Sequence, residues 1–303
     1  MRAFAPAKLN LCLLLGPPRH DGRHQLVTMY ESLSLVDDVE LTLSPGPGPE
    51  PDRVICPEVP GENLARLTLA GLRDRGWDAP GVVVEITKRI PIAAGMAGGS
   101  ADAAAVLRIA LALSPGLEAV VGELAAELGS DVPAQLAPGP SIGTGAGDVV
   151  TLLAPLGEHA VVVVPSRERL PTTAVYAEAD RLGLPRPAAE LAGLERSLRE
   201  AALAGGPLPG ELAVNDLQPA AVSLCPSISA ALRDVVRAGA ERALVSGSGP
   251  TVVGLLWGEG ARARADEAAR ALAPRHPGTL VATPVEPGFG APEPVLDRVR
   301  PRG

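Results

Sequence analysis

The chain has 303 residues, 46% of them apolar and 20% charged, which is typical of a globular protein of one or two domains. Its net charge of −8, with only two residues each of Trp, Tyr and Phe, argues against nucleic-acid binding, which needs a basic surface and stacking side chains. The sequence shows no apolar run of membrane-spanning length and no signal peptide, and its three scattered cysteines indicate neither a disulfide framework nor a metal cluster. We therefore expect a cytoplasmic protein.

The first half of the chain predicts strands followed by helices. Apolar or alternating residues predict strands over 9–15, 29–36, 39–43 and 82–86. Helical spacing of apolar residues predicts helices over 62–76, 101–113 and 118–129. The Pro/Gly-rich stretch 44–51 predicts a surface loop.

The second half predicts a β-α-β-β-α-β order with an enlarged first crossover, which is the ferredoxin-like arrangement. Strands are expected over 160–164, 242–246, 251–256 and 279–283, with helices between 171 and 238 and over 260–273. The pattern predicts an α+β fold with two domains, 1–154 and 155–287. A Pro-rich tail, 288–303, is expected to be disordered.

The stretch "RIPIAAGMAGGSADAAAVL", residues 89–107, joins a predicted strand to a predicted helix through a loop rich in glycine. It lacks the lysine of the commonest phosphate-binding loop and also the dinucleotide fingerprint. Glycines in this number indicate that a ligand approaches the backbone closely, and amides at a helix start suit the β- and γ-phosphates of a nucleotide. Ser100 would then cap the helix and also bind Mg²⁺ held on the nucleotide; the simpler alternative is a tight turn in which Ser100 only caps. The residues expected at the nucleotide are Pro91, Gly95, Met96, Ala97, Gly98, Gly99 and Ser100.

A second stretch, "PAKLNLCLLLGPPRHDGRHQL", covers residues 6–26. Lys8 lies at the mouth of a buried strand, where an unpaired ammonium is costly, and Asn10 shares its face of that strand. His24 follows a turn at Asp21-Gly22. Taken alone, Lys8 is more simply a solvated residue at a strand edge, and His24 a loop residue without a task.

Two further stretches allow both a structural and a functional interpretation. In "ELGSDVPAQL", Asp131 is either the N-cap of a short helix or a carboxylate that accepts a proton from a substrate hydroxyl, kept ionised by a nearby lysine. In "LVSGSGPTVVGLL", the turn of Gly247, Ser248 and Gly249 is either an ordinary hairpin or a backbone segment that contacts phosphate.

In this order, "PAKLNLCL", "PIAAGMAGGSADAAA" and "VSGSGPTVVGLL" resemble the three motifs of the GHMP kinase superfamily. "RHDGRHQLVTMYESLSLVDDV", "LGSDVPAQL" and "PTTAVYAEA" resemble further landmarks of one of its branches, and the likeness runs from about residue 5 to 256. That branch uses ATP and Mg²⁺ to phosphorylate the tertiary 2-hydroxyl of a cytidine-diphosphate-linked methylerythritol, in the non-mevalonate route to isoprenoids. The resemblance implies an N-terminal domain like domain 2 of ribosomal protein S5 and a ferredoxin-like C-terminal domain.

The same resemblance implies roles for individual residues. Asp131 would be the base or the orienting carboxylate and Lys8 its partner, while His24 would hydrogen-bond the cytosine and Tyr176 stack on it. The other implied roles are Asn10 at the methylerythritol, Thr172 in the cytosine pocket, Gly247, Ser248 and Gly249 at the substrate, Lys88 at the nucleotide and Asn63 at the adenine. A monomer or homodimer that acts on a small molecule, with neither nucleic acid nor membrane as partner, is expected.

Two positions depart from the family pattern. Arg23 stands where the family usually has a second aromatic residue against the cytosine; its flat guanidinium can stack on a base or turn toward the diphosphate. Ala101 replaces a frequent second serine of the glycine loop. Two alternatives remain: another member of the superfamily, such as a homoserine or mevalonate kinase, and a nucleotide-binding protein without catalysis.

Overall fold

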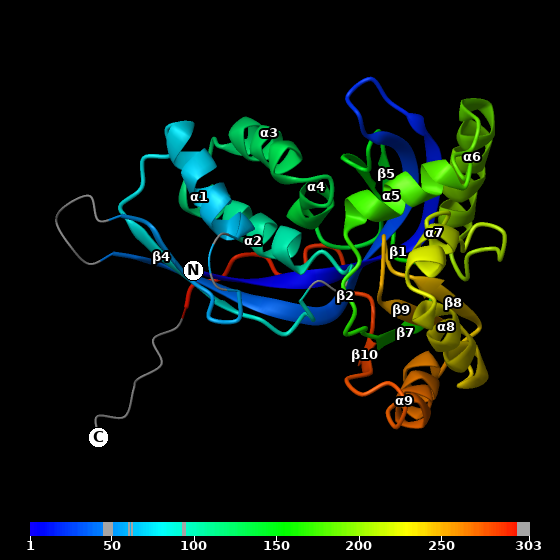
Figure 1. The fold of residues 1–303 in the computed structure, drawn as a ribbon. Coiled ribbons are helices and arrows are strands. Elements are labelled where there is room, and N and C mark those ends of the chain that lie inside the picture. The colour runs from blue at the N-terminus through cyan, green and yellow to red at the C-terminus, as the bar shows by residue number, and fades with distance from the viewer. Residues whose placement is uncertain (45–50, 60, 62, 93–94, 296–303) are drawn as a thin grey trace.

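The computed structural model describes residues 1–44, 51–59, 61, 63–92 and 95–295, which form two sheets with helices packed around them (Figure 1). The strands of the first sheet are β1 (Arg2–Pro18), β2 (His24–Leu43), β3 (Arg53–Ile55), β4 (Val82–Thr87), β5 (Ser141–Thr144) and β6 (Val149–Leu152). The predicted loop 44–51 falls almost entirely outside the described residues. Within the described part, none of the helices combines the length and apolar character needed to cross a bilayer.

The long antiparallel pair β1 and β2 is the spine of the molecule (Figure 1). β2 pairs along one edge with β1, and along its other edge with β4 at one end and β5 at the other. The sequence predicted two strands, 29–36 and 39–43, where the structure has one. The acidic pair Asp37-Asp38 separates the two predicted strands in the sequence and suggests a break between them. The strand continues through this pair because Lys88 and Arg2 neutralise the two carboxylates.

Four helices cover one end of the first sheet (Figure 1). They are α1 (Leu64–Asp74), α2 (Gly98–Leu113), α3 (Glu118–Leu128) and α4 (Val132–Leu136). The alanine-rich α2 lies at the centre of this core, and its small side chains let it contact β1, α1, α3 and α4 at once. Because α2 is buried along most of its length, its N-terminus is held firmly against β1.

The second sheet has the ferredoxin-like order β10-β7-β9-β8, as predicted. Its strands are β7 (His159–Val164), β8 (Arg242–Val245), β9 (Val252–Trp257) and β10 (Leu280–Ala282). The helices of this half are α5 (Thr172–Arg181), α6 (Ala188–Ala204), α7 (Gln218–Leu224), α8 (Ser227–Arg237) and α9 (Ala261–Leu272).

Both faces of β7 are buried, which joins the two halves into one packed body. Val161 and Val163 pack in the same core as Leu9 and Leu11 of β1. The alternate residues of β7 face a core shared with α5, α7, α8 and α9. The second half is therefore fixed against the β1–β2 spine.

The chain beyond β10 returns to the first sheet instead of leaving the surface (Figure 1). Arg2 and Glu293 exchange backbone hydrogen bonds, and the ring of Phe289 stacks on Phe4. The buried guanidinium of Arg108 donates to the carbonyl oxygens of Phe4 and Gly290. The disorder predicted from residue 288 is therefore wrong for 288–293, because backbone pairing and an arginine hold this segment; residues 296–303 lie outside the described residues.

A buried acid and a buried base meet where β2 faces β7. Glu31 and His159 are each less than 5% exposed, with Glu31 Oε2 3.6 Å from His159 Nε2, and Trp257 stacks on the imidazole. Burial raises the pKa of Glu31 to about 8, with a contribution from the charge of Glu286, and burial lowers the pKa of His159. Both groups are therefore predominantly uncharged at neutral pH.

The shifted pKa of Glu31 predicts a pH dependence of stability. Between pH 4.5 and 8 the folded chain keeps a proton that the unfolded chain releases, so the free energy of unfolding falls as pH rises, by up to ~1.4 kcal/mol per unit, and levels off above pH 8. Glu31→Gln should remove this contribution to the fall in the free energy of unfolding, which is measured by urea denaturation from pH 5 to 8. Glu40→Gln, on an exposed position of the same strand, should leave the slope unchanged. An equal slope in wild type and Glu31→Gln would contradict the assignment.

Candidate active site

A cleft of about 880 Å³ lies where the spine, the start of α2, the α3–α4 turn, α5 and the β8–β9 turn meet. Apart from Gly249, every residue that the sequence predicted for the site lines this cleft. A Cβ on Gly249 would lie 2.9 Å from Val245 of the preceding strand, so this glycine faces its own domain and not the cleft. The expectation that Gly249 contacts substrate is not supported by this placement.

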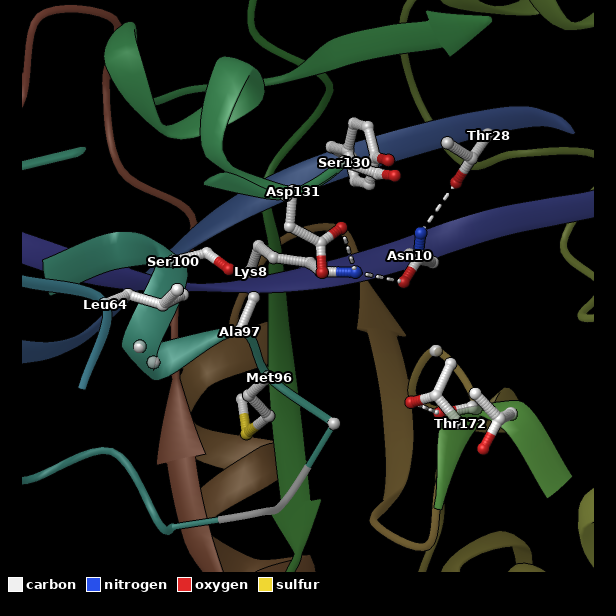
Figure 2. Close-up of a pocket in the computed structure, with 18 of the residues that line it drawn as sticks. Lys8, Asn10, Thr28, Leu64, Met96, Ala97, Ser100, Ser130, Asp131 and Thr172 are labelled. Carbon is white, nitrogen blue, oxygen red and sulfur yellow. Dashed lines mark hydrogen bonds and ion pairs between the residues drawn. The ribbon is translucent and has the colours of Figure 1, made fainter. Parts of the chain in front are cut away.

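Lys8 stands at the centre of the cleft. Its side chain is 6% exposed, and its Nζ lies 2.8 Å from Asn10 Oδ1 and 3.0 Å from Asp131 Oδ1 (Figure 2). The ammonium also lies 5.1 Å from the ring centroid of Tyr30, on whose face a cation is favourable. The interpretation of Lys8 as a solvated residue at a strand edge is therefore wrong, because it is a buried cation with polar partners.

Asp131 occupies the N-cap position of α4, but its side chain makes no capping hydrogen bond there. The carboxylate turns instead toward Lys8 and remains 34% exposed on the cleft side (Figure 2). Of the two interpretations of this residue, the geometry favours the one in which a lysine and an aspartate act as a pair. A carboxylate held by a cation and open to a cleft can accept a proton from a bound hydroxyl.

One face of β2 forms a long wall of the cleft. Side chains alternate along a strand, and His24, Leu26, Thr28 and Tyr30 all line the cavity. Thr28 accepts a hydrogen bond from Asn10 Nδ2 at 2.7 Å and donates to the carbonyl oxygen of Cys12 at 2.6 Å. Thr28 and Tyr30 were not among the predicted site residues, because the second strand was predicted to begin at residue 29 and they were therefore not placed on the same face as His24.

The glycine loop ends in an unusual helix start. Ala97, the N-cap of α2, has φ of +53°, a left-handed conformation that is costly for a residue with a Cβ. The helix begins at Gly98, so Ser100 lies in its first turn and is not the N-cap; the predicted capping role is wrong. Its side chain points toward the Lys8–Asp131 pair (Figure 2). The first amide groups of α2 thus open toward the cleft next to the two charged residues.

Gly95 brings the two halves of the molecule into backbone contact. Ser246, which is fully buried, donates from Oγ to the Gly95 carbonyl oxygen at 3.1 Å. A Cβ on Gly95 would lie 2.7 Å from the Ser246 carbonyl oxygen and 3.0 Å from that of Gly249. Asn215 holds the same turn by donating to the carbonyl oxygens of Val245 and Gly247. The β8–β9 turn therefore sets the position of the glycine loop.

Lys88 and Asn63 line the cleft, but their polar groups have partners within the protein. Lys88 donates to the buried carboxylates of Asp37 and Asp102, and Asn63 Oδ1 accepts from Arg66 N at the start of α1. Burial raises the pKa of Asp102 to about 7, against the lowering effect of the Lys88 ammonium. Their predicted contacts with nucleotide remain predictions.

The far end of the cleft is formed by His24 and one face of α5. Thr172, Tyr176 and Asp180 follow one another at intervals of four residues, which places them on one side of the helix. The rings of His24 and Tyr176 lie 5.3 Å apart, and His24 Nε2 lies 2.8 Å from Asp180 Oδ1. Asp180 was not among the predicted site residues, although its position one helical turn after Tyr176 indicates that it shares the same face of α5.

Arg23 borders this end of the cleft with its guanidinium held by two carboxylates. It donates to Asp148 Oδ2 at 3.0 Å and to Asp21 Oδ2 at 3.1 Å. Hydrogen bonds from the Ala146 backbone amide and from Arg23 lower the pKa of Asp148 despite its partial burial. The planar cation is thus fixed in place; its stacking on a base stays a prediction.

Comparisons with known proteins agree with this architecture. The profile of the GHMP kinases N terminal domain matches residues 63–139, and that of the GHMP kinases C terminal domain matches residues 194–275. The chain belongs to the GHMP kinases. The first profile covers α1 through α4 with the glycine loop, and the second runs from within α6 to just beyond α9.

Several curated relatives of this GHMP kinase carry the same name. A 4-diphosphocytidyl-2-C-methyl-D-erythritol kinase of Thermobifida fusca (strain YX) is 43% identical over 81% of this chain and 83% of its own. The kinase of the same name from Kineococcus radiotolerans is 40% identical over 95% of this chain and 86% of its own. A crystal structure of 4-(cytidine 5'-diphospho)-2C-methyl-D-erythritol kinase superposes with a TM-score of 0.74 at 31% identity, covering 93% of this chain and 98% of that one. Homoserine kinase from Cytophaga hutchinsonii, 19% identical with a TM-score of 0.67 over 96% of each chain, shares the fold.

The backbone contact at Gly95 predicts a specific loss of stability. Gly95→Ala adds a Cβ that collides with two carbonyl oxygens at φ of +69°, whereas at Gly76 (φ +82°) an added Cβ meets nothing within 4 Å. We expect Gly95→Ala to lower the free energy of unfolding by about 1–3 kcal/mol more than Gly76→Ala, measured by urea denaturation. Equal losses in the two variants would mean that the loop moves away freely from the β8–β9 turn.

Proposed function

We propose that this GHMP kinase transfers the γ-phosphoryl group of ATP to the 2-hydroxyl of 4-diphosphocytidyl-2-C-methyl-D-erythritol, in the non-mevalonate route to isoprenoids. The observation that carries the proposal is the Lys8–Asp131 pair, 3.0 Å apart, between the glycine loop and the His24–Tyr176 end of a single cleft. The names of the relatives, at about 40% identity over most of the chain, support the choice of substrate.

The layout of the cleft suits a long substrate whose base is recognised at one end and whose hydroxyl group reacts at the other. The base would stack on Tyr176 within hydrogen-bond reach of His24, and the hydroxyl would lie at Asp131. His24 precedes Thr28 by four strand residues, which is ~13 Å of extended chain and leaves room for a ribose and a diphosphate. Thr28 and Asn10 mark where the methylerythritol would lie, because they connect directly to Lys8.

The chemistry requires positioning and charge more than covalent assistance. The hydroxyl oxygen attacks the γ-phosphorus, the bond from that phosphorus to the β–γ bridging oxygen breaks, ADP leaves, and the hydroxyl proton passes to the Asp131 carboxylate. Lys8 holds that carboxylate in place and sets a positive charge beside the reacting oxygen. The amides at the start of α2 would bind the phosphates that flank the breaking bond.

The residues present fit a magnesium ion that arrives on the nucleotide. Ser100 offers a hydroxyl oxygen in the first turn of α2, and Asp102 Oδ1 is buried without a hydrogen-bond partner among the described residues. Hydroxyl and carboxylate oxygens are the ligands that Mg²⁺ prefers. When bound, the ion would neutralise charge on the β- and γ-phosphates, and Ser100 would hold it.

The direct test is an ADP-release assay with three acceptors, 4-diphosphocytidyl-2-C-methyl-D-erythritol, homoserine and mevalonate. We expect turnover with the cytidine compound, and loss of it when Mg²⁺ is chelated. Turnover with homoserine or mevalonate alone would replace the proposal with another activity of the same fold.

Three buried free cysteines suit the reducing cytoplasm in which we place the enzyme, as a monomer or homodimer.

The role assigned to Asp131 predicts a large effect on rate. Asp131→Asn keeps the shape of the side chain but removes the base, so kcat should fall by ~10²–10⁴ while ATP binding, measured by calorimetry, changes little. Glu127→Gln, an exposed carboxylate nearby that pairs with Arg75, serves as the control and should keep its rate. A near-normal kcat for Asp131→Asn would reduce Asp131 to a partner that only anchors Lys8.

A further inference from the structure

Asp180 and His24 form a dyad at the far end of the cleft that the reaction itself does not use. His24 Nε2 lies 2.8 Å from Asp180 Oδ1, and the histidine side chain is 8% exposed while that of the aspartate is 49% exposed. An ionised carboxylate has no proton to donate, so the hydrogen in this bond must be on Nε2. In neutral imidazole the other ring nitrogen, Nδ1, is then an acceptor.

The second ring nitrogen is free to meet a ligand. His24 Nδ1 has no hydrogen-bond partner within the described residues, and the side chain lines the cleft beside Tyr176. An acceptor at this place favours a base that presents an amino group and disfavours one that presents a carbonyl oxygen. Cytosine and uracil differ in this respect at C4, where cytosine carries the amino group.

We propose that Asp180 is a positioning residue that selects the base: by fixing the Nε2–H tautomer of His24, it makes Nδ1 an acceptor for the amino group of cytosine and rejects uracil. This inference rests on the proposed function, because it assumes that the substrate base binds at His24. It adds a residue to that site. Asp180 lies on the same side of α5 as Tyr176, so one helix both packs against the base and sets its hydrogen-bond partner.

The test compares the cytidine substrate with its uridine counterpart in wild type and two variants. Asp180→Asn keeps the size of the side chain but can donate as well as accept, so it no longer fixes the tautomer. The matched control is Asp234→Asn, which removes the carboxylate of a similar pair, His276 Nε2 to Asp234 Oδ2 at 3.1 Å, outside the cleft. The measured quantity is the ratio of kcat/KM for the two substrates.

We expect Asp180→Asn to lower the cytidine-to-uridine ratio by about 10-fold, the value of one hydrogen bond, through KM for the cytidine substrate. Its KM for ATP should not change, and kcat at saturation should be nearly that of wild type. Asp234→Asn should leave the ratio as in wild type. An unchanged ratio in Asp180→Asn would overturn the inference while leaving the proposed function intact. Failure of wild type to use the cytidine substrate would instead overturn the proposed function.

A spectroscopic measurement on the wild-type protein tests the tautomer directly. The chain has four histidines, so the ¹⁵N resonances of His24 can be identified by comparison with His24→Gln. In the neutral ring we expect a protonated Nε2 and an unprotonated Nδ1 in His24, and a mixture of tautomers in Asp180→Asn. A protonated Nδ1 in the neutral wild-type ring would refute the assignment even if Asp180→Asn failed to fold.

Discussion

The burial of the Lys8 ammonium is the constraint on which the rest of the site depends. A lysine that is only 6% exposed needs polar partners, since an isolated charge in such a place is strongly destabilising. Its partners come from β1 itself, through Asn10, and from the turn between α3 and α4, through Asp131. The ion pair therefore fixes the helical layer of the first domain to the strand that also runs into the core of the second.

Glycine allows the two domains to share one cleft. Gly95 lies so close to the β8–β9 turn that its position excludes any side chain, and Gly98 lies where a Cβ would stand 3.3 Å from Lys88 Nζ. The loop is thus packed on both sides by the protein, by carbonyl oxygens on one and an ammonium on the other. The remaining side of the loop, with the first amides of α2, faces the cleft. The glycines therefore allow the loop to pack closely against the protein as well as to let a ligand approach the backbone.

Much of this arrangement could be read from the sequence, and the parts that could not have identifiable causes. The motifs around Lys8, Gly98 and Asp131 predicted a site because each places an unusual residue type next to the end of a predicted strand or helix. Thr28 and Asp180 escaped notice because they are ordinary polar residues within a strand and a helix, whose importance appears only when the face they share is known. Disorder was wrongly predicted for residues 288–293, because the proline content there does not reveal the hydrogen bonds from Arg108 that hold this segment.

Lysines are the usual cations of a phosphate-binding cleft, but Lys8 and Lys88, which line this one, are both balanced by carboxylates of the protein. Lys8 is balanced by Asp131, and Lys88 lies between Asp37 and Asp102. Whether or not Asp102 is protonated, with its pKa raised to about 7, the Lys88 group carries no net positive charge. Under the proposed function, attraction for the nucleotide would come mainly from the oriented amides at the start of α2 and from a magnesium ion bound to the nucleotide. In this chain of net charge −8, Lys8 and Lys88 therefore position carboxylates and backbone. Binding of phosphates by backbone amides also explains why the glycine loop itself needs no lysine.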